Sequence, residues 1–109
     1  MKKKMLMLLA TLLPLFFVFS TVKADDAITI VSDTAYAPFE FKDSDQTYKG
    51  IDVDLITEIA KRSGWEYTMN HPGFDAAVNA VQAGQADAIM AGMTITEARQ
   101  KVFTFSDPY

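Results

Sequence analysis

The chain has 109 residues, half of them hydrophobic, and its ten basic and fourteen acidic side chains leave a formal net charge of −4. An acidic chain is a poor partner for nucleic acid, which needs clustered lysine and arginine, and for an anionic membrane surface. The absence of cysteine from the sequence excludes disulfide bonds and cysteine-ligated zinc sites.

Residues 1–24 have the organisation of a secretory signal peptide. Three lysines precede an almost entirely apolar run at residues 5–19, and Val22-Lys23-Ala24 offers the small or aliphatic residues of a cleavage site. A membrane anchor is disfavoured, because a spanning helix needs about 20 apolar residues and this run has about 15. Cleavage after Ala24 would leave residues 25–109. These keep all fourteen acids but lose four of the ten basic residues, so their formal net charge would be −8.

Strand and helix patterns alternate after residue 24. Residues 28–32 are a β-branched run that predicts a buried strand, and residues 39–41 alternate as a short strand. A polar turn follows at residues 42–47. Residues 50–63 then carry apolar side chains at helical spacing, and Gly64 is suited to end that helix.

The second half of the chain continues this alternation. The expected elements are a strand at 65–70, a helix at 74–83 with Asp75 as its N-cap, a buried strand at 86–91, a short helix at 97–102 and a strand-like run at 103–106. This order predicts an α/β fold with a mainly parallel sheet and flanking helices. Because a strand-like run leads into the last residues, the sequence also suggests a piece of a larger domain.

The segment 91-AGMTITEAR-99 follows an expected strand and is the first candidate site. Open α/β sheets bind ligands at the carboxyl ends of their strands. Thr94 offers a hydroxyl and an N–H group there, and the Arg99 guanidinium suits a carboxylate. Alternatively the segment starts a helix, with Thr94 and Glu97 forming a capping box or with Thr96 as the cap. Both interpretations stay open, since helix N-termini attract anions.

The segment 33-DTAYAPFEF-41 is the second candidate site. Asp33 ends the first expected strand, so its carboxylate would lie at the same sheet edge, with Tyr36 three residues further on. The alternative is that Asp33 caps a turn while Tyr36 and the phenylalanines pack in the core. The same two alternatives, a ligand contact or core packing, stay open for Phe74 at the start of an expected helix. Asp52 and Asp54 are instead explained by the favourable positive end of their helix.

Signals of catalysis are weak in this sequence. The only histidine, His71, stands beside a proline in an expected loop, and there is no cysteine nucleophile. Neither a G-x-S-x-G nucleophile motif nor a glycine-rich phosphate-binding motif is present. We therefore expect no enzyme activity, no cofactor and no metal site.

Three segments in succession resemble the polar amino-acid-binding proteins of ABC transporters, within the periplasmic-type family of solute-binding proteins. They are DTAYAPFEF, YKGIDVDLITEIAKRSG and FDAAVNAVQAGQADAIMAGMTITEARQKVFTFSDPY. The resemblance implies a periplasmic-binding-protein-like fold of type II, in which two α/β lobes close on one amino acid. Residues 25–109 would form most of the first lobe. It also implies export to a periplasm or to the outer face of the cytoplasmic membrane, and delivery to ABC permease subunits, separate or fused to the same chain.

The resemblance also implies how the ligand's head group is held. Arg99, the arginine of the G-[MIL]-T-x-T-x-x-R motif, would bind the α-carboxylate, and Thr94 would add its hydroxyl and N–H to the same group. Gly92 would offer a backbone carbonyl to the α-ammonium, and Met93 lies in the same ligand-binding segment. An acid of the second lobe would complete the ammonium site. Without that lobe, we expect this chain to bind weakly or not measurably.

The remaining implied contacts concern the ligand's side chain. Tyr36 and Phe74 would sandwich its aliphatic part, and Asp33 would face its end. A carboxylate there would repel glutamate or aspartate but could accept from an amide or pair with a cation. Glycine at 92 resembles the glutamine binders, although Tyr36 is also common in binders of basic amino acids. Glutamine is therefore expected ahead of arginine, lysine or histidine.

Two other functions share this fold and stay open. One is the ligand-sensing domain of a receptor or kinase. The other is an exported dehydratase acting on small cyclic acids, which would need an acid or base in the cleft, and this part of the sequence offers no clear candidate beyond Asp33.

Overall fold

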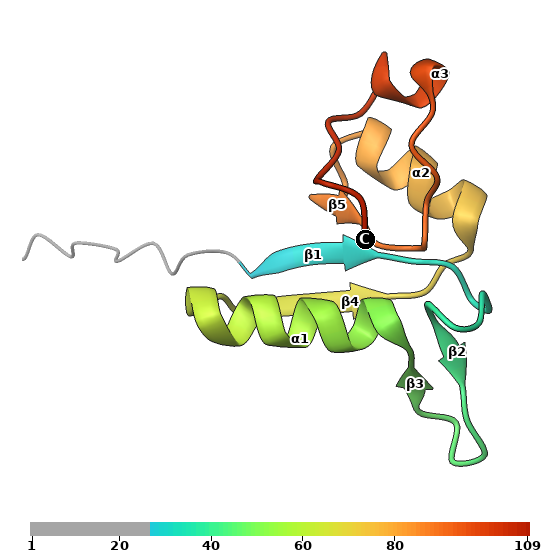
Figure 1. Cartoon of the computed structure of the whole chain (residues 1–109), viewed down its shortest axis with the longest axis vertical. Coiled ribbons are helices and arrows are strands. Elements are labelled where there is room, and N and C mark those ends of the chain that lie inside the picture. Colours follow the sequence, from blue (N-terminus) through green and yellow to red (C-terminus); the bar gives the residue numbers. More distant parts are fainter. Residues whose placement is uncertain (1–26) are drawn as a thin grey trace, which may run out of the picture.

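The computed structural model describes residues 27–109, so the expected signal peptide lies outside the described residues. The described residues form eight elements, which Figure 1 places in space. They are β1 (Ile28–Val31), β2 (Phe41–Lys42), β3 (Tyr48–Lys49), α1 (Ile51–Ser63), β4 (Tyr67–Asn70), α2 (Phe74–Gln82), β5 (Ala88–Ile89) and α3 (Glu97–Gln100). None of the helices in residues 27–109 has the length and apolar character to cross a membrane.

Strand β1 is the middle strand of a three-stranded parallel sheet with the order β4-β1-β5. Ile30 lies opposite Met69 on one side and Ala88 on the other. A strand with parallel neighbours on both sides is covered by crossover helices, which explains why the β-branched Ile30 and Val31 are both buried. Helix α2 connects β4 to β5. The predicted α/β fold with a mainly parallel sheet and flanking helices is confirmed.

Helix α1 begins where the chain passes very close to an earlier segment. Gly50 precedes it with φ 130°, and a Cβ atom at Gly50 would lie 2.2 Å from the Phe39 carbonyl oxygen. The first N–H groups of α1 donate to that earlier segment, Ile51 to the Pro38 carbonyl and Asp52 to the Phe39 carbonyl, both at 2.9 Å. Only glycine fits this junction, which attaches the start of α1 to the loop after β1.

Helix α2 contributes the fully buried Ala77 to a small core with Val31 and Ala86. Its N-cap is Gly73, and the prediction that Asp75 caps it was wrong. The Gly73 carbonyl already accepts the N–H of Ala77 at 2.9 Å, so the helix starts at Phe74. Asp75 lies within the first turn, where a carboxylate is stabilised by the helix dipole.

The hairpin between β1 and α1 differs from the prediction for residues 39–41. Its first strand is β2, which begins two residues and ends one residue later than expected, and it pairs antiparallel with β3, which the sequence analysis did not identify. Phe39 lies in a turn closed by a bridge between Tyr36 and Glu40. Two-residue strands carry too little periodicity to be read from sequence, and only the pairing partner defines them.

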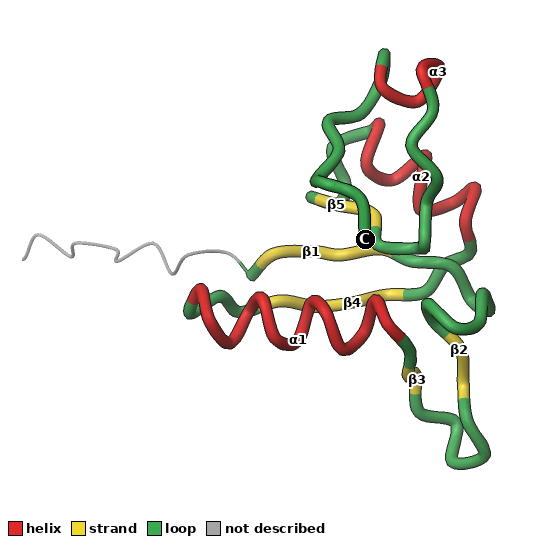
Figure 2. The backbone as a smooth tube through the Cα atoms, in the orientation of Figure 1, coloured by secondary structure: helices red, strands yellow, loops and turns green. Residues whose placement is uncertain are grey.

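The strand expected at residues 103–106 does not form. The backbone hydrogen bonds of this segment end at Phe103, whose N–H donates to the Arg99 carbonyl at 2.9 Å. Figure 2 shows residues 101–109 as loop. Phe103 and Phe105 still alternate with exposed neighbours. The side-chain pattern of a strand is therefore present, but within residues 27–109 no neighbouring strand pairs with it.

Candidate functional site

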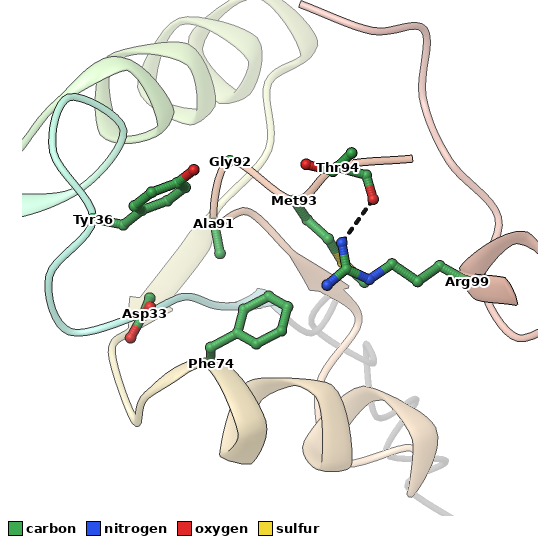
Figure 3. A pocket seen from close by; sticks show the side chains of 8 residues that line it. All are labelled: Asp33, Tyr36, Phe74, Ala91, Gly92, Met93, Thr94 and Arg99. Carbon is green, nitrogen blue, oxygen red and sulfur yellow. Dashed lines mark hydrogen bonds between the residues drawn. The ribbon is translucent and has the colours of Figure 1, made fainter. Parts of the chain in front are cut away.

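A pocket of about 220 Å³ opens beyond the carboxyl ends of β1 and β5 (Figure 3). Its lining contains all seven residues expected from the sequence, together with Ala91, which the sequence analysis missed. These are Asp33, Tyr36, Phe74, Ala91, Gly92, Met93, Thr94 and Arg99. Ala91 could have been found from its place at the end of the third expected strand, next to Gly92. The parallel sheet thus brings three separate segments to one edge.

Asp33 has one carboxylate oxygen occupied and one open. Its Oδ1 accepts from the N–H of Thr34 at 2.7 Å and from the Thr34 hydroxyl at 3.4 Å, so the turn-capping interpretation is correct. Among the described residues, no group donates to Oδ2. The Asp33 carbonyl lies 3.0 Å from Nδ1 of His71, which fixes the backbone at this point. Asp33 can therefore cap its turn and still meet a ligand.

Two aromatic rings lie around the pocket in Figure 3. Tyr36 is 46% exposed, so the alternative that it packs in the core is wrong. Its ring is supported from behind by Phe39, with 5.1 Å between ring centroids. Phe74, the first residue of α2, is half-buried, and its ring lies 5.4 Å from the Arg99 guanidinium carbon. The rings come from different elements and leave a space that an aliphatic chain could fill.

Arg99 turns back from α3 towards the pocket, as Figure 3 shows. Its Nη1 donates to the Thr94 carbonyl at 2.8 Å. Since a guanidinium has five N–H donors, most of them remain for a ligand. Of the two capping alternatives, Thr96 is the one observed, because its hydroxyl accepts from the Arg99 N–H at 3.2 Å. The Thr94 hydroxyl has no hydrogen-bond partner in the described part of the chain.

Gly92 is held in a conformation and a space that only glycine suits. Its φ is 54°, and a Cβ atom would lie 2.6 Å from ring carbons of Phe39 and 2.9 Å from the Tyr36 ring. Its N–H donates to Oδ2 of Asp52 at 2.7 Å, so the backbone donor of Gly92 is occupied. No backbone hydrogen bond in residues 27–109 uses the Gly92 carbonyl. The carbonyl is thus the free polar group that Gly92 offers to the pocket.

Two buried acids close to the pocket were not recognised from the sequence. Asp52, explained above only by the helix dipole, is fully buried in the first turn of α1, and Glu40 is also fully buried. The dipole explanation was incomplete, because Asp52 accepts hydrogen bonds from outside its helix. A signal existed: Asp52, Ile56 and Ala60 are spaced by four residues and are the buried residues of α1. Glu40 had no comparable signal.

The charges of the pocket are separated. In Figure 3 the Arg99 guanidinium and the Asp33 carboxylate lie on different sides of the space, with the Phe74 ring between them. A zwitterion with a polar side chain needs this arrangement, since each of its charges must find a partner when it leaves water. In residues 27–109, no group of three His, Cys, Asp or Glu side chains could hold a metal ion.

A sequence model of the bacterial extracellular solute-binding proteins, family 3, matches residues 28–109. The chain belongs to this family. Its relatives are solute-binding proteins and not enzymes.

Two curated relatives illustrate the similarity. The lysine/arginine/ornithine-binding periplasmic protein of Escherichia coli K12 is 36% identical over 106 residues, which are 96% of this chain and 41% of the relative. The probable histidine-binding protein of Neisseria gonorrhoeae is 39% identical over 80 residues, 73% of this chain and 30% of the relative. The chain thus spans less than half the length of these relatives.

Solved structures of family members agree with the fold. The second substrate-binding domain of a putative amino acid ABC transporter from Streptococcus pneumoniae is 54% identical, with a TM-score of 0.74 over 75% of this chain and 37% of that chain. An ancestral arginine-binding protein, solved with glutamine and with arginine, is 39% identical with a TM-score of 0.71 over 75% of this chain and 36% of that one.

A third solved structure consists of a single domain. The arginine-bound form of domain 1 from TmArgBP is 41% identical, with a TM-score of 0.72, over 76% of this chain and 66% of that chain. Domain 1 of that protein therefore holds arginine in a crystal. These structures confirm the type II periplasmic-binding-protein fold for the part of the domain present here.

Proposed function

We propose that this chain is the first-lobe part of an extracytoplasmic solute-binding protein that captures a polar amino acid, with glutamine favoured, for delivery to the permease of an ABC importer. Residues 1–24 would direct export, and residues 25–109 would form most of the first lobe. The observation that carries the proposal is the pocket in which Arg99 and Asp33 lie apart with aromatic rings beside the space between them. The periplasmic and extracellular relatives support the location.

The α-carboxylate would bind at the Arg99 end of the pocket. The hydrogen bond from Nη1 to the Thr94 carbonyl holds the guanidinium in place before a ligand arrives. Its remaining N–H groups can form a two-pronged pair with a carboxylate, which is stronger than a neutral hydrogen bond. The Thr94 hydroxyl, open among the described residues, would be an additional donor.

The α-ammonium would meet the Gly92 carbonyl, with Met93 next to it in the pocket lining. Because the Gly92 N–H is occupied by Asp52, the backbone of Gly92 itself offers only its carbonyl to the ligand. A single carbonyl does not neutralise a charge. A charged partner from the rest of the protein is therefore part of the proposal, and binding by residues 25–109 alone is expected to be weaker than by the intact protein.

The side chain of the ligand would extend between Tyr36 and Phe74 towards Asp33. Both hydrogen bonds from Thr34 use Oδ1 of Asp33, so one oxygen is left for the ligand. A single oxygen suits one N–H of an amide, whereas a guanidinium is best paired with both oxygens of a carboxylate. This favours glutamine over arginine. An ancestral arginine-binding protein has been solved with glutamine and with arginine, which supports keeping arginine as the second candidate.

The test is calorimetry of the intact exported protein with each of the twenty amino acids. We expect glutamine to bind most tightly, with arginine, lysine and histidine as weaker ligands and glutamate and aspartate without measurable heat. A protein that binds none of the polar amino acids would contradict the proposed function. Tighter binding of a basic amino acid would retain the function and overturn only the ligand.

The same titration on residues 25–109 measures what the first lobe contributes. The sequence predicts weak or no measurable binding, and the arginine-bound domain 1 of TmArgBP favours weak binding over none. Affinity equal to that of the intact protein would show that the second lobe adds no ligand contact.

A further inference from the structure

Behind the pocket, two buried carboxyl groups belong to different segments of the chain. Asp52 lies in the first turn of α1, and Glu40 lies just before β2. Both are fully buried. The pocket residues Gly92 and Tyr36 line the space in front of them. Buried acids are costly unless they are paired or protonated, so these two need a physical explanation that the ligand contacts do not supply.

Both carboxylate oxygens of Asp52 accept hydrogen bonds, and the two donors come from distant segments of the chain. Its Oδ2 accepts from the Gly92 N–H at 2.7 Å, and its Oδ1 accepts from the Tyr109 hydroxyl at 2.6 Å. Burial and then the hydrogen bond to Asp52 raise the pKa of Tyr109, so this phenol remains a donor. One carboxylate therefore joins α1, the pocket loop and the last segment of the chain.

Glu40 differs from Asp52 in its hydrogen bonds. Within residues 27–109 neither of its oxygens has a hydrogen-bond partner. Burial first, and then the negative charge of the neighbouring Asp52, raise the pKa of Glu40 to about 8. The other titratable groups near it are Asp33, at the end of β1, and Tyr109 in the last segment, so its surroundings are acidic. Two neighbouring buried carboxyls cannot both carry a charge at low cost, and Glu40 is the one that keeps its proton at neutral pH.

We propose that Asp52 is a positioning residue of the amino-acid pocket, and that Glu40 must stay protonated for Asp52 to hold the Gly92 peptide in its binding orientation. The proposal rests on the proposed function, because it assumes that the Gly92 carbonyl contacts the ligand. It adds that pH controls the contact between the Gly92 carbonyl and the ligand.

The geometry explains why the position of Gly92 would respond. Its φ of 54° and its tight packing against Phe39 and Tyr36 leave the peptide one arrangement. If Glu40 loses its proton, a second buried charge repels Asp52, and the hydrogen bond from the Gly92 N–H to Asp52 is the contact that can break. The carbonyl would then turn from the ligand, and the supported ring of Tyr36 would shift with it. Ligand affinity should therefore fall as pH rises through the range in which Glu40 ionises.

The test compares Glu40→Gln with the parent protein by calorimetry with glutamine between pH 6.5 and pH 9.5, using the intact exported protein. Glutamine at position 40 is uncharged at every pH and has nearly the same shape. At pH 7 we expect its affinity to lie within about threefold of the parent. Between pH 7 and pH 9 the parent should lose about tenfold more affinity than the variant. The comparison cancels the titration of the ligand's own ammonium. Equal pH dependence in the two proteins would overturn the proposal.

Asp52→Asn tests the positioning role directly. It keeps an oxygen that can accept from Gly92 but loses the charge, and we expect a 10- to 100-fold weaker affinity at pH 7. The matched control is Glu58→Gln on the exposed part of the same helix, whose partner is Arg62, and it should leave affinity unchanged. Unchanged affinity in Asp52→Asn would overturn the role.

A readout that needs no ligand separates this proposal from the function. The amide proton of Gly92 should change its chemical shift with a midpoint near the pKa of Glu40 in the parent, and not in Glu40→Gln. If no amino acid binds but this titration is seen, the proposed function fails while the carboxyl pair's control of Gly92 stands. If amino acids bind and the amide does not titrate, the reverse holds.

Discussion

Two aspartates near the pocket, Asp33 and Asp52, show how the same side chain serves opposite purposes. Asp33 lies at the rim, where a single turn occupies one of its oxygens and leaves the other open. Asp52 is fully buried, and donors from Gly92 and Tyr109 occupy both of its oxygens. The rim acid can exchange partners with a ligand, whereas the buried acid can only hold its neighbours in place.

From this difference we expect substitutions at the rim to alter ligand choice, and substitutions at the buried acid to alter affinity for every ligand. Side chains at the rim that still have a free hydrogen-bonding atom contact the ligand's side chain, which differs from one amino acid to the next. Buried groups whose hydrogen bonds are all made within the protein hold the backbone in place. That backbone contacts the α-ammonium and α-carboxylate, which all amino acids share. The predictions below test this division.

The largest effect is expected for Arg99→Ala, which removes the partner of the ligand's α-carboxylate. Leaving a carboxylate unpaired in such a site costs about 2–5 kcal/mol, which is at least about 30-fold in Kd. Calorimetry should show this loss for every amino acid that binds. Arg62→Ala is the matched control, because Arg62 is exposed and pairs only with Glu58. An Arg99→Ala protein with parental affinity would place the carboxylate elsewhere.

The next effect concerns stability and pH. Because the pKa of Glu40 rises from 4.5 in the unfolded chain to about 8 in the folded one, the folded state binds the extra proton between these values. Its contribution is therefore fully present below pH 4.5 and is lost as pH rises through about 8. Urea denaturation should show the parent losing more stability than Glu40→Gln from pH 5 to pH 8.5. Parallel curves would mean that Glu40 is ionised throughout.

Gly92→Ala should destabilise the protein by about 1–3 kcal/mol, because its methyl group would overlap the Phe39 ring and its φ is unfavourable for alanine. Gly84→Ala is the matched control: its φ of 72° is similarly unfavourable, but nothing lies within 4 Å of the added Cβ. Thermal unfolding of both variants separates backbone strain from steric overlap. Equal losses would show that the aromatic rings move aside without cost.

The smallest effect is expected for Asp33→Asn, which should alter ligand preference more than total affinity. Glutamine should lose about fivefold, since a neutral oxygen replaces a charged one at a cost of about 1 kcal/mol. Arginine should lose more, because a cation loses its counter-charge. The measured quantity is the ratio of the two Kd values, with Asp54→Asn on the exposed side of α1 as control. Unchanged glutamine affinity would contradict the role of Asp33.

Residues close together in the chain were predicted well. The bounds of α1 and α2 agree with the predicted helices within one residue, because a helix is read from local periodicity and from the glycines at its ends. The pocket lining was predicted almost completely, with Tyr36, Phe74, Gly92 and Met93 expected from the resemblance to the family. In a parallel sheet, residues just after each strand share one edge, so chain order alone brings Asp33 and the 91–99 segment together.

The tertiary structure alone decided the features that depend on partners far along the chain. Thr96 rather than Thr94 caps α3, and Asp52 is a buried acceptor rather than a surface charge. Within residues 27–109, no strand pairs with residues 103–106. The order of the elements could be read from the sequence because it follows from short-range periodicity, whereas most of the pocket residues were expected from the resemblance to the family. The protonation of Glu40 and the orientation of the Gly92 peptide follow from groups brought together by folding, since an acid's charge depends on everything that surrounds it.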